Sequence, residues 1–156
     1  MNMRRWIVLL VCLMCLVGCA NKDEFTLLVE GMSKQTFETE SRYVDLMLEL
    51  KEIGEDVYRY RLVINQPKAN LDNVKAFVVC DESAESTIPS IGFYDNDKCN
   101  LYISKIDLEN NYYEGISLMG LTTENSVVCS IYLSYEVNGE IYEEYIVMEE
   151  SCHDAS

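Results

Sequence analysis

Apolar and polar residues alternate along much of this chain, in short runs that end at turn-forming residues. In residues 57–64 every even-numbered position is apolar or aromatic, whereas the odd-numbered positions include Arg59 and Arg61. Residues 74–80 place only small or branched apolar residues on one of their two faces. A period of two is typical of a β-strand that buries one face. The pattern therefore predicts strands over 57–64 and 74–80.

Four shorter runs bounded by turn-forming residues are also predicted as strands. They are residues 25–30, 91–94, 101–103 and 115–121. The sequence Asp95-Asn96-Asp97 stands between the second and third of these runs. Because such residues favour tight turns, we expect a hairpin there.

A stronger hairpin signal lies near the C-terminal end. Val127 to Val137 and Glu140 to Met148 are rich in β-forming residues, and Asn138-Gly139 separates them. Both residues of an Asn-Gly pair tolerate the positive φ angles of a type I′ turn. A two-residue loop fixes the register, so we expect Tyr135 opposite Tyr142 on the core face. The intervening residues then form a second, half-exposed face.

Residues 43–53 fit two kinds of element. Their apolar residues alternate as in a strand. The same segment would also place an apolar set on one face of a helix, namely Tyr43, Leu46, Met47, Leu50 and Ile53. The Leu, Met, Glu and Lys content favours the helix. A strand is favoured by the position, since only a short turn at 54–56 precedes the strand predicted over 57–64. The sequence therefore leaves both a strand and a helix open for this segment, and we prefer the strand.

The number and spacing of these runs predict the fold class. About 7–9 short strands, with no alternation of strands and helices, indicate an all-β, antiparallel immunoglobulin-like β-sandwich. We expect it to occupy residues 25–150, with a C-terminal tail over 151–156. The pattern is similar to that of the immunoglobulin-like domains of bacterial surface lipoproteins.

The first residues have the composition of a removable leader. A short stretch with Arg4 and Arg5 precedes twelve residues, 6–17, that carry no charge or amide. As a helix these residues span about 18 Å, well short of the roughly 30 Å hydrocarbon core of a membrane. They therefore predict a signal peptide, removed with residues 1–18, rather than a transmembrane helix.

The end of this leader, Leu16-Val17-Gly18-Cys19, resembles the lipobox of bacterial lipoproteins. The resemblance covers residues 1–19. It implies signal peptidase cleavage between Gly18 and Cys19 and a covalent diacylglycerol on Cys19, with no other cofactor expected. Two acyl chains anchor a protein stably where one does not. Residues 19–24 then form the lipidated cysteine and a short tether at the bacterial cell membrane or outer membrane, facing outside the cytoplasm.

The charge balance excludes one class of partner. The chain has 27 Asp and Glu against 12 Lys and Arg, and its formal net charge is −15. After Lys105 there is no Lys or Arg. Such a surface repels phosphate backbones, so we expect no nucleic-acid partner. The acidic residues keep the domain soluble or, alternatively, attract a cationic partner.

The cysteines allow two interpretations. Those that follow Cys19 are Cys80, Cys99, Cys129 and Cys152. Cys80 and Cys129 fall on predicted inward faces, so one hypothesis is a disulfide between the two sheets, as in antibody domains. The other hypothesis is that buried cysteines remain free and act as small hydrophobic residues.

Neither catalysis nor metal binding is expected. The one histidine, His153, lies in the tail, so a Ser-His-Asp or Cys-His pair is hard to assemble. No Gly-rich phosphate loop and no HExxH motif occurs. Asp95-Asn96-Asp97 resembles the start of a calcium loop but lacks its glycine and final glutamate, so a plain turn is favoured. No Cys-x-x-Cys pair follows Cys19.

Tyrosines supply the candidate binding surface, because tyrosine offers a large contact area and a hydroxyl group. Tyr132 and Tyr145, paired on the half-exposed face of the C-terminal hairpin, are the first candidates. Tyr112 and Tyr113 in a loop are the second. Cross-strand tyrosine pairs also stabilise sheets without a ligand, so a structural role is the competing interpretation.

These observations lead to an expected function. We expect a membrane-anchored, extracytoplasmic lipoprotein that binds or docks another envelope or surface protein, and not an enzyme. The alternative is a lipoprotein that binds a small ligand or a divalent cation through acidic loops.

Overall fold

The computed structural model describes residues 23–81, 87–94 and 96–152. The chain divides into two compact units, Met1–Gly31 and Met32–Ser156. Helix α2 (Glu24–Gly31) belongs to the first unit, and all the strands belong to the second. The strands are β1 (Asp45–Gly54), β2 (Val57–Asn65), β3 (Asp72–Cys80), β4 (Ser90–Ile91), β5 (Asn100–Leu101), β6 (Tyr112–Tyr113), β7 (Gly115–Thr122), β8 (Ser126–Val137) and β9 (Glu140–Ser151). Two 3-10 helices, η1 (Met32–Lys34) and η2 (Leu108–Asn110), complete the described elements.

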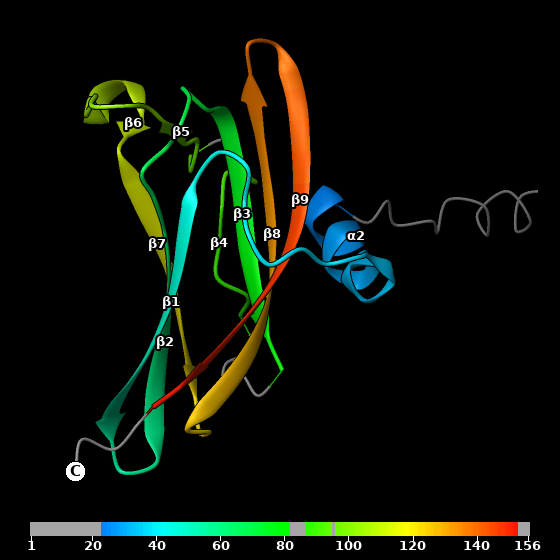
Figure 1. Ribbon diagram of the computed structural model, residues 1–156, viewed down its shortest axis with the longest axis vertical. Helices are drawn as coiled ribbons and strands as arrows, with labels where there is room; N and C mark the ends of the chain where they lie inside the picture. The colour runs from blue at the N-terminus through cyan, green and yellow to red at the C-terminus, as the bar shows by residue number, and fades with distance from the viewer. Residues whose placement is uncertain (1–22, 82–86, 95, 153–156) are drawn as a thin grey trace, which may run out of the picture. The chain divides into compact units, whose positions relative to one another are not determined.

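The long strands form two antiparallel sheets (Figure 1). One sheet has the order β1-β2-β7 and the other the order β4-β3-β8-β9. Each sheet combines strands from early and late parts of the chain, so that both sheets depend on long-range pairing. The predicted all-β, antiparallel sandwich is therefore confirmed, with nine strands in the described part of the chain.

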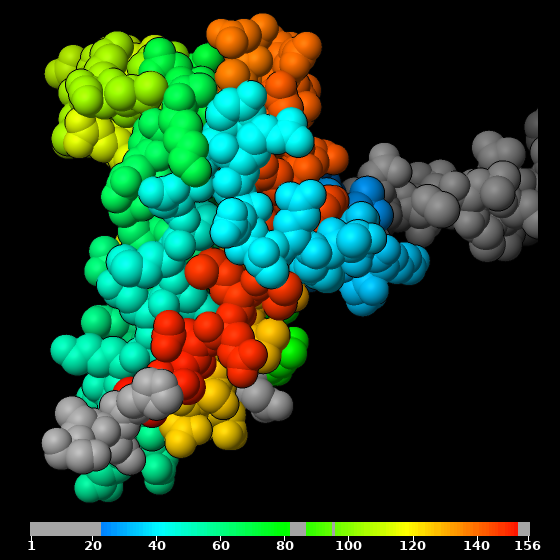
Figure 2. All heavy atoms as spheres, viewed as in Figure 1, coloured from blue at the N-terminus to red at the C-terminus, as the bar shows by residue number. Residues whose placement is uncertain are grey.

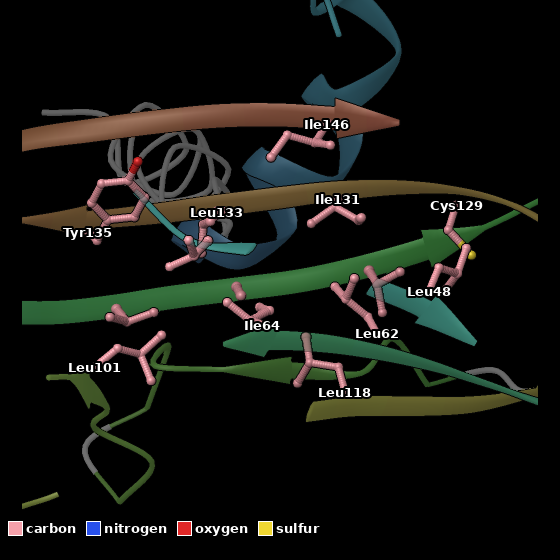
Figure 3. Close-up of a cluster of buried hydrophobic side chains, with 14 of the residues drawn as sticks. Leu48, Leu62, Ile64, Leu101, Leu118, Cys129, Ile131, Leu133, Tyr135 and Ile146 are labelled. Carbon is pink, nitrogen blue, oxygen red and sulfur yellow. The ribbon is translucent and has the colours of Figure 1, made fainter. Parts of the chain in front are cut away.

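The core lies between the two sheets and consists mostly of aliphatic side chains (Figure 3). Its fully buried members include Leu62, Ile64, Leu101, Ile131, Leu133 and Ile146. The predicted inward face of residues 57–64 is confirmed, because Tyr60, Leu62 and Ile64 are buried. Burial of one such side chain contributes about 1.5–3 kcal/mol, so this layer is the main stabilising element of the sandwich.

The ambiguous segment 43–53 is a strand. Strand β1 pairs antiparallel with β2, so that Leu48 lies opposite Leu62. Val44 and Leu48 are buried, as the alternating pattern predicts. Pairing and burial outweigh the helix propensity of Leu, Met, Glu and Lys, because propensity alone is a weak term.

The C-terminal hairpin forms in the predicted register. Asn138 and Gly139 have φ angles of 53° and 85°, as a type I′ turn requires. Tyr135 pairs with Tyr142, and the ladder continues without interruption from Val137 to Ser126. This hairpin, drawn from gold through orange to red in Figure 1, forms two adjacent strands of the larger sheet.

The prediction of a strand over 25–30 is wrong. These residues form helix α2. Asp23 caps its first turn, since its side chain accepts a hydrogen bond of 2.8 Å from the backbone N–H of Thr26. The helix also begins within the expected tether 19–24. Among the described residues, no helix combines the length and the apolar content that crossing a membrane requires.

The prediction of a hairpin around residues 95–97 is also wrong. A local turn exists, in which the N–H of Asp97 donates to the carbonyl of Tyr94 over 3.1 Å. The flanking strands nevertheless have other partners: β4 pairs with β3, and β5 pairs in parallel with β6. The partners of β4 and β5 are therefore determined by long-range pairing, and not by the turn-forming residues between them.

Candidate functional site

The candidate site is the loop between β5 and β6, residues 102–111, which we call the tip loop. It lies at the end of the sandwich that also carries the turn between β8 and β9 (Figure 1). Helix η2 forms its last part. Loops at the end of a β-sandwich are a common place for binding residues, since the sheets below hold them rigidly.

Backbone hydrogen bonds hold both ends of the tip loop. The N–H of Leu101 and that of Leu71 each donate to the other residue's carbonyl, which ties the loop to the start of β3. Asp107 and Tyr112 form a similar reciprocal pair. Asn111 takes the left-handed conformation, with φ 59°, and ends helix η2. The loop is therefore ordered before any partner binds, which lowers the entropic cost of binding.

Two residues of the tip loop, Tyr102 and Lys105, form an aromatic cluster with Tyr112 of the adjoining strand β6. The ring centroids of Tyr102 and Tyr112 lie 4.5 Å apart. The Lys105 ammonium lies 3.9 Å from the centroid of the Tyr112 ring and 5.6 Å from that of Tyr102. The Tyr102 hydroxyl donates a 2.6 Å hydrogen bond to Asp72, which raises the pKa of the phenol to about 12. Tyr102 therefore stays a protonated donor at neutral pH.

Three aliphatic side chains of the same loop point into solvent. Ile103 is 52% exposed, Ile106 is 65% exposed and Leu108 is 69% exposed. The yellow-green atoms of this stretch lie at one end of the domain (Figure 2). Single exposed aliphatic residues are common on protein surfaces, but three in one short loop beside two aromatic rings in contact have the composition of an interface core.

An open hollow of about 430 Å³ lies beside the tip loop. Tyr102, Ile103 and Ser104 line it from the loop, while Gln66 and Glu114 line it from the neighbouring connections. Gln66 and Ser104 have φ angles of 48° and 52°. Residues other than glycine rarely adopt this conformation, and it is enriched at ligand-binding positions.

The structure separates the two loop tyrosines chosen from the sequence. Tyr112 belongs to the tip loop's aromatic pair with Tyr102. Tyr113 is half-buried and packs against the hydrophobic core. The alternation of a strand explains the difference, because successive residues of β6 point to opposite sides.

Tyr132 does not lie on an exposed face. Its side chain is 1% exposed, and its ring stacks on Phe77 with centroids 5.2 Å apart. Phe93 and Tyr145 contact the other sides of the ring. Burial raises the pKa of Tyr132. Tyr145 is half-buried, so this pair forms a second hydrophobic cluster on the sheet face opposite the core rather than a contact surface.

Cys80 and Cys129 are joined in a disulfide. The expectation that such a bridge would link the two sheets is corrected by the register, in which the two residues are direct partners on β3 and β8 of one sheet. Their Cα atoms lie 4.1 Å apart. Cys99 and Cys152 are free, and burial raises the pKa of the Cys99 thiol to about 12. An un-ionised, buried thiol is a poor nucleophile.

A second hollow, of about 130 Å³, lies next to Glu144. Glu144 is 9% exposed, and its carboxylate accepts hydrogen bonds from the Ser41 hydroxyl (2.5 Å), the Arg42 backbone N–H (3.0 Å) and the Tyr135 hydroxyl (2.6 Å). These three donors satisfy the carboxylate and fix the segment before β1 to β9. We therefore assign Glu144 a structural role.

Several residues chosen from the sequence lie outside the described residues. They include Gly18 and Cys19, the remainder of the leader, and His153. Within the described ranges, no group of three or more His, Cys, Asp or Glu side chains is arranged to hold a metal ion.

Sequence reasoning missed most of the tip loop. Residues 101–103 were expected to form a strand, so Ile103 was placed in a regular element and not in a loop. The signal lies in the spacing of Ile103, Ile106 and Leu108, which fits neither the period of a strand nor a helix of useful length. Three aliphatic residues that no regular element can bury indicate an exposed apolar loop.

Comparisons with protein-family models, curated proteins and solved structures found no match to this chain.

Proposed function

We propose that this protein is a lipid-anchored, extracytoplasmic docking module that binds another envelope or surface protein through its tip loop. The exposure of Ile103, Ile106 and Leu108 on a loop fixed by hydrogen bonds carries the proposal. Exposed aliphatic and aromatic side chains on a rigid support are typical of the central part of protein interfaces.

The anchoring half of the proposal rests on the sequence. The lipobox residues Leu16 to Cys19 support it. The Cys80–Cys129 disulfide also favours a location outside the cytoplasm, because disulfides persist in oxidising compartments.

The substitution Cys19→Ala tests the anchor. We expect the protein purified from its native membrane to have the mass of residues 19–156 plus two or three acyl chains. The Cys19→Ala variant should keep its leader and carry no acyl chain, because the lipid is attached to the Cys19 thiol. Intact-mass spectrometry measures both. An uncleaved or unlipidated native protein would contradict the anchor.

Site-specific cross-linking in the native cell tests the docking surface. A photoreactive amino acid placed at position 108 should give an adduct of defined mass with a partner protein. The additional substitution Ile106→Asp should remove this adduct, since it places a charge in the apolar contact. Because Ile106 is exposed, the free energy of unfolding should change by less than about 0.5 kcal/mol.

A matched position on another surface provides the control. Met47 on β1 is 46% exposed and is not part of the tip loop. The same photoreactive group at position 47 should not give the adduct. Equal yields at positions 47 and 108, or an adduct that persists in the Ile106→Asp variant, would show that docking does not use the tip loop.

A further inference from the structure

The hollow beside the tip loop has a lining of unusual chemistry. Its polar side chains are Asn65, Gln66, Ser104 and Glu114, and the hydroxyl of Tyr102 is already bonded to Asp72. Across the described part of the chain, the side chains of those four residues have no hydrogen-bond or ion-pair partner. All four offer oxygen acceptors, and no Lys or Arg lines the hollow.

Glu114 supplies the one charge in this lining. It is exposed, it directly precedes β7, and it has no ion pair with a described residue. Gly115, the next residue, pairs with Asn65 in the ladder between β7 and β2. Glu114 therefore adjoins the end of the ladder at which Asn65 lies, and both residues line the hollow. A carboxylate beside amide oxygens favours a cation.

From this geometry we infer that the hollow receives the side chain of an arginine or lysine of the docked partner. The guanidinium or ammonium group binds Glu114 and the neighbouring oxygen acceptors, while apolar residues on either side contact Ile103 and Leu108. This inference rests on the proposed docking function and states the chemistry of the partner. The net charge of −15 adds long-range attraction for a basic partner.

A divalent metal ion fits the same lining less well. Calcium takes six to eight oxygen ligands, often with several carboxylates, and magnesium requires near-ideal octahedral geometry. The described lining provides a single carboxylate in an open hollow of about 430 Å³. A long side chain that ends in several N–H donors uses more of the available acceptors.

Two short peptides distinguish a cationic site from a purely apolar one. The probes are N-acetyl-Leu-Arg-Leu-amide and the same peptide with citrulline, which has almost the shape of arginine but no charge. Saturation-transfer NMR with the full chain, in nanodiscs of zwitterionic lipid, measures their affinities. We expect the arginine peptide to bind about fivefold more tightly, as about 1 kcal/mol from an exposed ion pair implies.

The substitution Glu114→Gln removes the charge and keeps the shape. It should abolish the preference for arginine over citrulline. Glu109→Gln is the matched control, because Glu109 is a neighbouring exposed carboxylate of the tip loop that does not line the hollow. This control should keep the fivefold preference.

The outcomes separate this inference from the docking proposal. Equal affinity for both peptides, or a preference that survives in the Glu114→Gln variant, overturns the cationic site. If the peptides lose their preference for arginine but saturation still passes from the protein to their leucine methyl groups, the cationic site is overturned. Docking of apolar residues through the tip loop then still stands. Absence of binding by either peptide also overturns the cationic site, and the cross-linking experiment then decides the docking function independently.

Discussion

Reduction of the Cys80–Cys129 disulfide should lower the free energy of unfolding of the domain by about 4 kcal/mol. The two cysteines are 49 residues apart in sequence, so the bond closes a long loop in the unfolded chain. A cross-link of that length removes about this much conformational free energy from the unfolded state. Denaturant titration followed by circular dichroism, with and without a reducing agent, measures the difference.

The double variant Cys80→Ala, Cys129→Ala is the control for this experiment. Its unfolding midpoint should equal that of the reduced parent protein to within a few tenths of a molar and should not respond to reductant. Alanine keeps the positions apolar, so the comparison isolates the cross-link from gross changes in polarity. A parent protein whose stability is the same in oxidised and reduced form would contradict the expected contribution of the bond.

The C-terminal hairpin shows where sequence reasoning succeeds. The Asn138-Gly139 turn has one favourable geometry, and a two-residue loop leaves only one register. Short-range chemistry therefore determines twelve pairs of partners, from Val137↔Glu140 to Ser126↔Ser151. No information about distant parts of the chain is needed.

The tip loop shows where such reasoning fails. Residues 101–103 have the composition of a strand, but only Leu101 is in one, and its partner strand β6 begins at Tyr112. Leu101 also pairs with Leu71, thirty residues earlier in the chain. Two long-range pairings thus leave Ile103 outside the sheet. Sequence periodicity does not contain these pairings, so it could not predict where the strand ends and the loop begins.

For the two cysteines of the disulfide, sequence reasoning was right about burial and wrong about the arrangement of the strands. The two-residue periodicity of their strands correctly placed both side chains on inward faces, where Cys80 is 4% exposed and Cys129 is fully buried. The assignment of their strands to opposite sheets was wrong, because it followed the antibody pattern. The pairing of β3 with β8 depends on the order of all strands in the sheet, which a local pattern does not specify.

The aromatic residues divide into two groups with different roles. Tyr132 and Phe77 are buried and stabilise the larger sheet, whereas Tyr102 and Tyr112 remain accessible next to exposed aliphatic side chains. Tyrosine content alone therefore does not identify a binding surface. The useful signal is a tyrosine next to aliphatic residues that have no place in the core.

Gly120→Ala should destabilise the sandwich by about 3 kcal/mol, at the upper end of the usual cost of overpacking. Gly120 on β7 is the direct partner of Tyr60 on β2. The Tyr60 ring passes over this glycine, so that an added Cβ would coincide with the ring's hydroxyl end. Because Tyr60 is only 1% exposed, the ring has no free space into which to move.

A double-mutant cycle tests this mechanism. Tyr60→Leu removes the ring and should itself be destabilising by about 2 kcal/mol through lost packing. In the Tyr60→Leu background, Gly120→Ala should cost at least about 1 kcal/mol less than in the parent, because the clash is gone. Gly54→Ala is the matched control, since its Cβ would meet only Val57 at 3.9 Å, an ordinary contact. Additive effects of the two substitutions would mean that Gly120 is required for a reason other than the Tyr60 ring.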